Sequence, residues 1–251
     1  MDLLLEICTP SLRSAFAAEH GGADRIELCS GLEMGGLTPG PATLQMALEH
    51  LRLNVAVLIR PRGGDFIYNT IEKQLILKEI EYCRNAGADG VVVGALMANG
   101  LLDESFAREM KDAAGPLEIC FHRAFDQATE PLTLLEQLIE LNYDRILTSG
   151  QQPTAWEGRA LLRDLVHQAR GRIVLMAGSG IHPELVAPLI HDTGIRQVHY
   201  SAKNTILPPA PHHAKLSFSA PGLPPDGYWE TDEVLVKKAR RALELVKRPL
   251  P

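Results

Sequence analysis

Acidic, basic and thiol side chains stand at the ends of short apolar runs along this chain of 251 residues. Glu6 and Cys8 close the run LLLEIC, and Glu27 and Cys29 close the run RIELC. Arg60 directly follows the run NVAVLI. Carboxyl groups against apolar walls can serve as general bases, thiolates bind soft metal ions, and arginine binds carboxylate or phosphate. These residue types predict an acid–base site, a metal site or an anion site, provided that the fold brings them together.

Two similar motifs place further charged groups just after apolar runs. The stretch IRPRGGDF (59–66) contains Arg62 and Asp65, and FHRAFD (121–126) contains His122, Arg123 and Asp126. Arginines at the exit of a strand suit the recognition of carboxylate or phosphate. His122 could act as the acid that partners a glutamate base, with Asp126 beside it. The two Arg-x-x-Asp pairs could also simply brace each other across the rim of a site.

The stretch MAGSGI (176–181) could form a phosphate-binding turn. Gly178, Ser179 and Gly180 precede a helical pattern, so their backbone N–H groups could face an anion at a helix N-terminus. Ser201, which follows the last apolar run, could complete the cradle. The alternative is an ordinary tight turn with no ligand.

Strand-like and helix-like segments alternate along the chain. The expected strands lie within residues 3–8, 22–29, 54–59, 87–94, 116–121, 142–150, 172–177 and 193–202. Helical patterns such as SLRSAFAAEH and PLTLLEQLIELN separate them. Eight alternating units predict a (β/α)8 TIM barrel that forms a single domain over residues 1–251. An open doubly wound sheet is the alternative, but no G-x-G-x-x-G motif follows the first strand.

The chain is less regular after the eighth expected strand. Residues 208–229 are rich in proline, serine and glycine, which predicts a long irregular loop. The stretch ETDEVLVKKARRALELVKR (230–248) is then expected to close the chain as a helix.

Side chains of a barrel strand point alternately into the lumen and outward toward the helices. If Ile26 and Leu28 face the helices, their neighbours face the lumen, and the same parity applies to the other strands. The side chains expected to face inward near the C-terminal ends of the strands are Glu6, Cys8, Arg25, Glu27, Cys29, Arg60, His122 and His199. Active sites of TIM barrels lie at this mouth. A structural ion network that fills the barrel is the alternative reading.

Cys8 and Cys29 form a candidate metal site. They stand at the ends of neighbouring strands, which lie about 4.8 Å apart. Two thiolates that each lie about 2.3 Å from one metal ion would be separated by a similar distance. Two soft ligands suit Cu(I). The alternative is that both cysteines are ordinary small apolar residues of the core.

Composition narrows the classes of partner. A net charge of −6 and a pI near 5.9 argue against nucleic acid and acidic membranes as partners. No apolar run approaches the roughly 20 residues that cross a bilayer, and the first residues do not form a signal peptide. The four cysteines form no CxxC motif, so they are expected to be reduced thiols in the cytoplasm.

Several stretches together resemble the CutC family of copper homeostasis proteins. They are LLEIC, GGADRIELC, GGLTP, IRPRGGDF, GPLEICFHRAFD, RILTSG and VHYSA, and they occur in order between residue 3 and about residue 202. The resemblance implies a cytoplasmic TIM barrel that is associated with copper handling and is usually a homo-oligomer, such as a dimer or tetramer. It also implies that Cys8 and Cys29 occupy positions proposed to bind Cu(I). The sequence departs from some relatives at Tyr200, where they carry a third cysteine.

Two functions follow as alternatives. The first is a protein that binds Cu(I) through Cys8 and Cys29 to buffer or deliver copper. The second is an enzyme that acts on a small anionic or phosphorylated substrate by Glu/His acid–base chemistry, with the anion held by Arg60 and Arg62. The stretch ILTSG carries no lysine, which disfavours Schiff-base chemistry. A non-catalytic scaffold is a third, less specific possibility.

Overall fold

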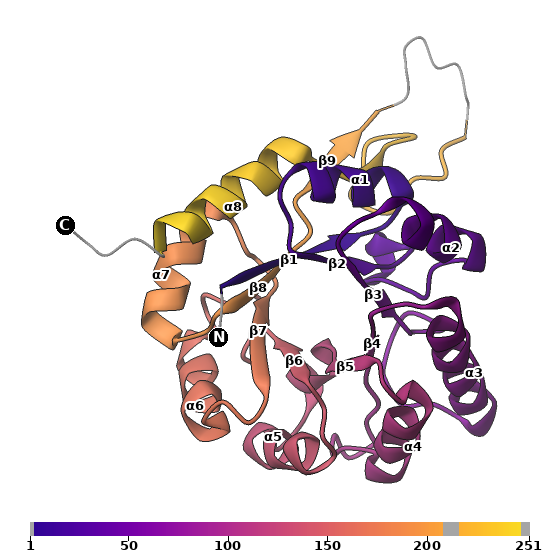
Figure 1. The fold of residues 1–251 in the computed structure, drawn as a ribbon, viewed down its shortest axis with the longest axis vertical. Helices are drawn as coiled ribbons and strands as arrows, with labels where there is room; N and C mark the ends of the chain where they lie inside the picture. Colours follow the sequence, from indigo (N-terminus) through magenta and orange to yellow (C-terminus); the bar gives the residue numbers. More distant parts are fainter. Residues whose placement is uncertain (1–2, 208–215, 247–251) are drawn as a thin grey trace.

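The computed structural model describes residues 3–207 and 216–246. Eight parallel strands close into a barrel, as expected, and β8 pairs with β1 to complete it (Figure 1). The barrel strands are β1 (Leu4–Thr9), β2 (Arg25–Leu28), β3 (Asn54–Leu58), β4 (Gly90–Val93), β5 (Glu118–Phe121), β6 (Arg145–Thr148), β7 (Val174–Gly178) and β8 (Gln197–Tyr200). The TIM-barrel prediction is therefore confirmed, and the open doubly wound sheet is excluded.

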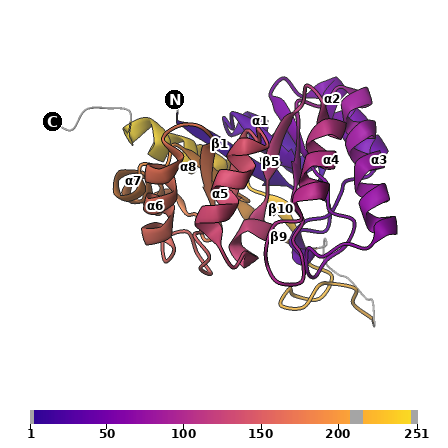
Figure 2. The ribbon, with the colours of Figure 1, turned by 90° about the horizontal axis from the view of Figure 1, so that it is seen from below.

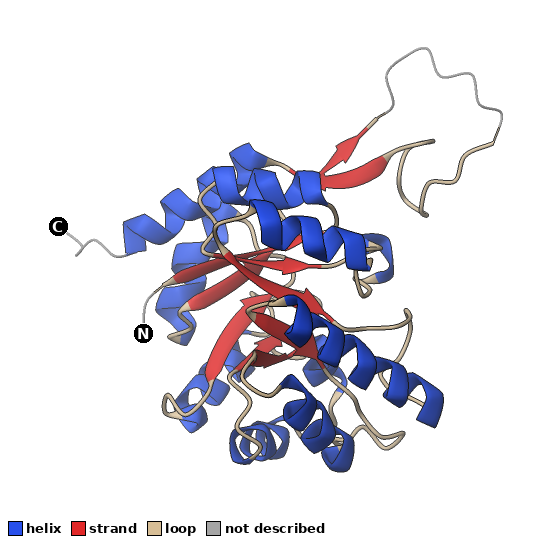
Figure 3. Ribbon diagram, turned by 45° about the vertical axis from the view of Figure 1, so that its right-hand side comes forward, coloured by secondary structure: helices blue, strands red, loops and turns tan. Residues whose placement is uncertain are grey.

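Helices surround the strands on the outside (Figure 3). They are α1 (Leu12–His20), α2 (Pro41–His50), α3 (Thr70–Ala86), α4 (Glu104–Ala114), α5 (Pro131–Glu140), α6 (Arg159–Ala169), α7 (Pro183–Thr193) and α8 (Glu233–Val246). Two short 3₁₀ helices, η1 (Leu32–Met34) and η2 (Arg123–Gln127), lie in the loops that follow β2 and β5. Among the described residues, no helix combines the length and apolar character that crossing a bilayer requires.

Local signals explain where several helices begin and end. The Ser11 hydroxyl accepts a hydrogen bond from the backbone N–H of Ser14 and so begins α1. Asn69 and Glu72 form a reciprocal capping box at the start of α3. Gly87 ends α3 with a φ of +87°, a left-handed conformation that glycine adopts without strain. These signals fix where α1 begins and where α3 begins and ends.

The strands carry two separate layers of buried side chains. Outward-facing residues such as Ile7, Ile26 and Val57 pack against the helices. A second cluster fills the lumen and consists of Cys8, Cys29, Ala56, Leu58, Val92, Cys120, Leu147 and Met176, with Leu32 against it. The inward direction predicted for Cys8 and Cys29 from strand parity is therefore observed. Cys83 belongs to the outer layer, on α3.

The segment after β8 is more regular than expected. Strands β9 (Lys203–Ile206) and β10 (Tyr228–Thr231) form a two-stranded antiparallel ribbon, which Figure 2 shows at one end of the barrel. The prediction of an irregular loop over 208–229 is therefore wrong at its C-terminal end, while 208–215 lie outside the described residues. Trp229 of β10 stabilises the ribbon, since the Lys203 ammonium lies 3.3 Å from the centre of its ring. The Glu230 carboxylate accepts a hydrogen bond from Ser11, which fastens β10 to α1.

Candidate functional site

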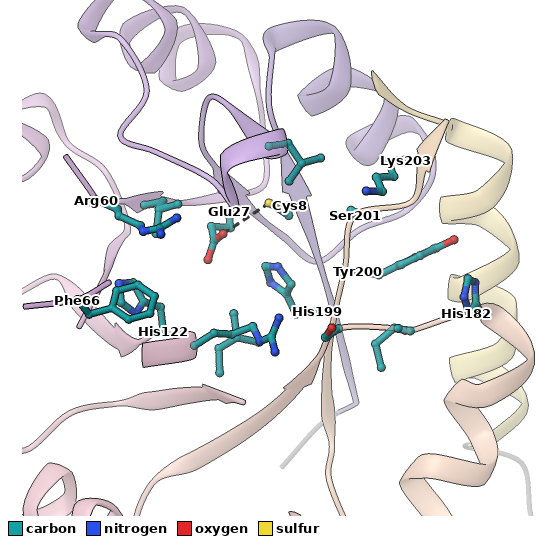
Figure 4. Close-up of a pocket in the computed structure, with 18 residues that line it drawn as sticks. Cys8, Glu27, Arg60, Phe66, His122, His182, His199, Tyr200, Ser201 and Lys203 are labelled. Carbon is teal, nitrogen blue, oxygen red and sulfur yellow. Dashed lines mark hydrogen bonds between the residues drawn. The ribbon is translucent and has the colours of Figure 1, made fainter. Parts of the chain in front are cut away.

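A cavity of about 510 Å³ opens at the C-terminal mouth of the barrel. Its volume lies in the range of small-molecule sites, which is roughly 300–1,000 Å³. The residues that line it are Cys8, Glu27, Leu32, Gly35, Leu58, Arg60, Phe66, His122, Arg123, Leu147, Ser179, Gly180, Ile181, His182, His199, Tyr200, Ser201 and Lys203 (Figure 4). Seven of the eight barrel strands, β4 excepted, contribute a lining residue or the loop that carries one. The convergence expected of the strand ends is therefore present.

Glu6 lies beneath this cavity at the centre of a buried ion network. Its carboxylate is fully buried and forms an ion pair with Arg25, and its Oε1 atom lies 2.7 Å from Nδ1 of His199. Burial alone would raise the pKa of Glu6, but the charge of Arg25 and the hydrogen bond with His199 outweigh burial and lower it. Because both oxygens are engaged and the group stays ionised, Glu6 suits a positioning role rather than the general base expected from sequence.

His199 is the residue that Glu6 positions. Burial would lower the pKa of His199, but the neighbouring Glu27 charge, Cys8 and Glu6 outweigh burial and raise it well above its ordinary value. The Nδ1–H group faces Glu6, so the other ring nitrogen remains for a ligand or a proton. Figure 4 shows the His199 ring beside Glu27 at the base of the cavity. Sequence parity placed this side chain inward but did not reveal its link to Glu6.

Glu27 is a buried carboxyl group that lacks a full set of partners. Its Oε1 atom accepts a hydrogen bond from Cys8 at 3.6 Å, while its Oε2 atom has no partner among the described residues. Burial raises the pKa of Glu27, although the His199 charge acts against this shift. A carboxyl group with a raised pKa and a free oxygen in a cavity has the properties of a general base.

The two predicted metal ligands lie side by side. The sulfurs of Cys8 and Cys29 are 3.5 Å apart, both side chains are buried, and both thiols are free. The hydrogen bond with Cys29, burial and the Glu27 charge raise the pKa of the Cys8 thiol. Ligand atoms of Cys8, Glu27 and His199 lie within 4.8 Å of one another. The described residues therefore contain a cluster of sulfur, oxygen and nitrogen atoms with the spacing of a metal site.

His122 occupies the other side of the cavity. Its Nδ1 atom accepts a hydrogen bond from the backbone N–H of Ala124 at 3.1 Å, and its Nε2 atom has no partner among the described residues. Burial and the charge of Arg60 lower the pKa of His122 to about 3. The imidazole is therefore neutral at pH 7, with its proton on Nε2. A neutral imidazole offers a hydrogen bond rather than an acidic proton, so we expect His122 to act as a hydrogen-bond donor in place of the acid predicted from sequence.

Arg60 lies in the same part of the cavity wall. Its Nη1 atom donates to the carbonyls of Met34 (2.8 Å) and Gly36 (3.1 Å), and Nη2 donates to the carbonyl of Gly64 (2.8 Å). Its Nε atom is buried and has no partner in the described part of the chain. The guanidinium thus holds two loops together, and one of its donors is buried without an acceptor among the described residues.

The remaining charged residues of the two loop motifs are engaged within their own loops. Arg62 donates to Glu72 (2.5 Å) and to Asp65 (3.1 Å), and neither Arg62 nor Asp65 lines the cavity. Arg62 and Asp65 therefore do not form the anion-binding rim of the cavity that the sequence predicts. Glu72, which belongs to the capping box of α3, pairs with Arg62 instead. Arg123 reaches the cavity and donates to Asp126 at 2.7 Å.

Asp126 fastens the loop after β5 to the end of β6. Its carboxylate accepts hydrogen bonds from the hydroxyl of Thr148 (2.5 Å) and from the backbone N–H of Ser149 (3.0 Å). It does not line the cavity. Its geometry therefore supports a structural role in place of the catalytic one expected from sequence.

The loop after β7 reaches the cavity through Ser179 and Gly180, and Ser201 lies on the same wall. Ser179 has a φ of +76°, and its hydroxyl donates to the carbonyl of Pro153 at 2.7 Å. Gly178 does not line the cavity, and a Cβ atom there would approach Leu147 to 2.6 Å. The glycine serves close packing at that position, while Ser179, Gly180 and Ser201 remain candidates for ligand contact.

Sequence reasoning missed two residues that shape the cavity. The rings of Phe66 and His122 pack at a tilt of 48° with their centres 4.7 Å apart, and the Arg60 guanidinium lies 5.0 Å from the centre of the Phe66 ring. Gly94 makes room for the imidazole, since a Cβ atom there would lie 2.5 Å from Nδ1 of His122. The only signals were a lone phenylalanine at the end of IRPRGGDF and a glycine at the end of GVVVG, and both are common in loops.

We expect the two cavity histidines, His122 and His199, to be in different protonation states at neutral pH. From about pH 5 to about pH 8, His122 should stay neutral with its proton on Nε2, and His199 should be protonated at neutral pH. The ring ¹⁵N shifts in NMR spectra report both states directly. A His122 ring that becomes cationic near pH 6.5, or a His199 ring that is neutral at neutral pH, would contradict the assignment.

The same assignment predicts that the two histidines change the free energy of unfolding with pH in opposite directions. His122 has a folded pKa below its ordinary value of 6.5, so protonation of the unfolded chain lowers the free energy of unfolding as the pH falls below that value. The folded pKa of His199 is raised, so its stabilising contribution is complete below pH 6.5 and is lost as the pH rises through the folded pKa.

Comparison with known proteins agrees with this architecture. The model of the CutC family matches residues 3–204. A CutC protein of Bacteroides thetaiotaomicron is 48% identical over 202 residues, which are 80% of this chain and 81% of the relative. The human copper homeostasis protein cutC homolog is 43% identical over 80% of this chain and 74% of its own. The crystal structure of a putative copper homeostasis protein CutC from Streptococcus agalactiae has a TM-score of 0.76 at 30% identity, covering 79% of this chain and 98% of that one. The chain belongs to the CutC family.

Proposed function

We propose that the protein binds one Cu(I) ion at the barrel mouth through the thiolates of Cys8 and Cys29, with His199 as a third ligand. The observation that carries the proposal is the 3.5 Å separation of the two sulfurs beside the cluster of Cys8, Glu27 and His199. Thiolate and imidazole are ligands that Cu(I) accepts. The human and mouse relatives are named copper homeostasis proteins, which supports copper as the ion.

The sulfur separation favours more than two ligands. With metal–sulfur bonds of about 2.3 Å, a linear site would place the sulfurs about 4.6 Å apart, and a tetrahedral angle would place them about 3.8 Å apart. The observed 3.5 Å is nearer to the bent arrangement. A bent pair of thiolates leaves room for a further ligand, and His199 is the nearest nitrogen donor in the cluster.

Glu6 supplies the support that metal-bound histidines usually have. A ligating imidazole commonly donates its other N–H group to a carboxylate, which fixes the orientation of the ring. Nδ1 of His199 lies 2.7 Å from Oε1 of Glu6, and the fully buried carboxylate is itself held by Arg25. This arrangement leaves Nε2 as the ring nitrogen that can bind the ion, once the imidazolium has lost its proton.

Competition with a chromophoric Cu(I) chelator tests the copper proposal. The wild-type protein should hold one Cu(I) per chain, and Cys8→Ser or Cys29→Ser should weaken binding by at least about 100-fold, because thiolates supply the main bonds. His199→Asn should weaken it by about 10-fold or more. Cys83→Ser is the matched control, since this buried thiol lies in the outer layer on α3, and it should leave the affinity unchanged.

Two results would contradict the copper proposal. One is a Cys8→Ser/Cys29→Ser double variant that folds and keeps the wild-type Cu(I) affinity. The other is a wild-type protein that binds Zn(II) tightly through these residues and does not compete for Cu(I), since two thiolates and an imidazole also suit zinc.

Acid–base catalysis on a small anionic substrate is the second candidate function. The observation that favours it is Glu27, a buried carboxyl group with a raised pKa and an Oε2 atom that has no partner among the described residues. His199 lies beside it as a cationic group held in place by Glu6. A base and a cationic acid that lie side by side in a cavity can move a proton to and from a bound carbon or oxygen atom.

Incubation in D₂O with a mixture of small carboxylic acids and phosphate esters tests this second candidate. The wild-type protein should exchange a carbon-bound proton for deuterium in at least one compound, as measured by mass spectrometry. Glu27→Gln should abolish the exchange. Glu33→Gln, which alters an exposed carboxylate of η1, should not change it. Catalysis would be contradicted if the wild-type protein exchanged no carbon-bound proton in any compound, or if the Glu27→Gln variant exchanged it as fast as the wild type.

A further inference from the structure

The cavity carries a second group of side chains on the side away from the thiols. Figure 4 shows Arg60, Phe66 and His122 together on one side, with Cys8 and Lys203 on the other. Arg60 and His122 are 6% and 4% exposed, so both are more than nine-tenths buried. Both line the cavity, and neither the copper site nor the Glu27 base accounts for them.

Arg60 brings a positive charge that has no carboxylate partner among the described residues. Three backbone carbonyls hold the guanidinium from both Nη atoms, which fixes its plane and leaves Nε without an acceptor. Carbonyl oxygens are dipoles and do not neutralise the charge. A buried charge is costly unless a counter-charge approaches it, so this arrangement favours an anionic partner. The Nε–Nη2 edge of a guanidinium is one that carboxylate and phosphate oxygens bind.

His122 adds a second hydrogen-bond donor close to Arg60. The N–H of Ala124 holds Nδ1, and the Phe66 ring packs against the imidazole at a tilt of 48°. The imidazole is therefore fixed, and its Nε2–H is buried without an acceptor among the described residues. A neutral ring can lie close to the Arg60 charge without repulsion. Glycine at position 94 leaves the space that the ring occupies. The result is a rigid pair of donors, one charged and one neutral, that both rest against Phe66.

The rest of the cavity wall is suited to a small organic molecule. Leu58, Phe66 and Leu147 add apolar surface to the cavity wall. Among the described residues that line the cavity, the cationic side chains Arg60, Arg123 and Lys203 outnumber the one carboxyl group, which belongs to Glu27. Arg123 is neutralised in part by Asp126. The balance of charge therefore favours an anion.

We propose that Arg60 and His122 form a binding subsite for the carboxylate or phosphate group of a small organic ligand, whose body lies against Phe66. Nε–H of Arg60 and Nε2–H of His122 donate to the anionic oxygens. The far end of such a ligand would extend toward Glu27 and Cys8. The subsite does not depend on the copper proposal. It deepens the second candidate function, because it is where the anionic group of such a substrate would bind, and the titrations below measure binding without turnover.

Titrations with inorganic phosphate and with acetate test the subsite, each followed by NMR at constant ionic strength with chloride as the reference ion. At least one of the two anions should bind saturably and shift the Nε2 resonance of His122. Saturation by phosphate alone would identify a phosphate ester as the ligand class, and saturation by acetate alone would identify a carboxylate. If neither anion binds more strongly than chloride, the proposal is overturned.

Three variants separate the subsite from a general effect of charge. His122→Asn can still accept the Ala124 N–H bond but loses Nε2–H, so anion affinity should fall by about 10-fold or more while the fold is retained. Arg60→Gln should weaken binding at least as much. Arg62→Gln is the matched control, because it removes the same charge from the same loop outside the cavity. Equal losses in Arg60→Gln and Arg62→Gln would show non-specific attraction and refute the subsite.

The subsite can also be tested independently of the metal. Cys29→Ser should lower the Cu(I) affinity by at least about 100-fold while phosphate or acetate binds as in the wild type. His122→Asn should retain Cu(I) binding. Loss of anion binding in Cys29→Ser, in a protein that remains folded, would contradict the existence of a separate anion subsite.

Discussion

The buried carboxylate of Glu6 is the constraint on which the mouth of this barrel depends. A fully buried negative charge requires partners, and here Arg25 and His199 meet it from the two strands that flank β1. Removing one member of a buried ion pair typically costs about 3–5 kcal/mol, so the arrangement fixes the His199 ring firmly. The positions of the groups above this layer depend on it, because His199 lies next to Glu27 and Cys8.

The mouth above Glu6 has two chemically different sides. On one side, soft sulfur atoms, an imidazole and a carboxyl group lie within reach of one ion. On the other side, a guanidinium and a neutral imidazole present N–H groups that lack acceptors within the described chain. Both groups line one cavity of about 510 Å³, which is large enough for a small molecule. A metal ion and an anionic ligand could therefore occupy the same mouth at once, each held by side chains suited to its charge.

Strand parity was enough to predict much of this site from sequence, because a parallel barrel repeats one inward direction on every strand. It placed Glu6, Cys8, Glu27 and His122 correctly, and the alternation of elements identified the fold. It could not predict the role of Arg62, whose partner Glu72 is a helix-capping residue in the next element. Nor could it predict protonation, since the neutral state of His122 depends on burial and on neighbours from other strands.

A crystal structure of the protein grown with Cu(I) under reducing conditions and with inorganic phosphate tests the two-sided account most directly. Anomalous scattering at the copper edge locates the ion without ambiguity. The account predicts one copper peak bonded to the sulfurs of Cys8 and Cys29, and a phosphate held by Nε of Arg60 and Nε2 of His122. The two-sided arrangement would be contradicted by copper bound away from both cysteines. It would also be contradicted by a phosphate that makes no contact with Arg60 or His122 and binds only at the loop of Ser179 and Gly180.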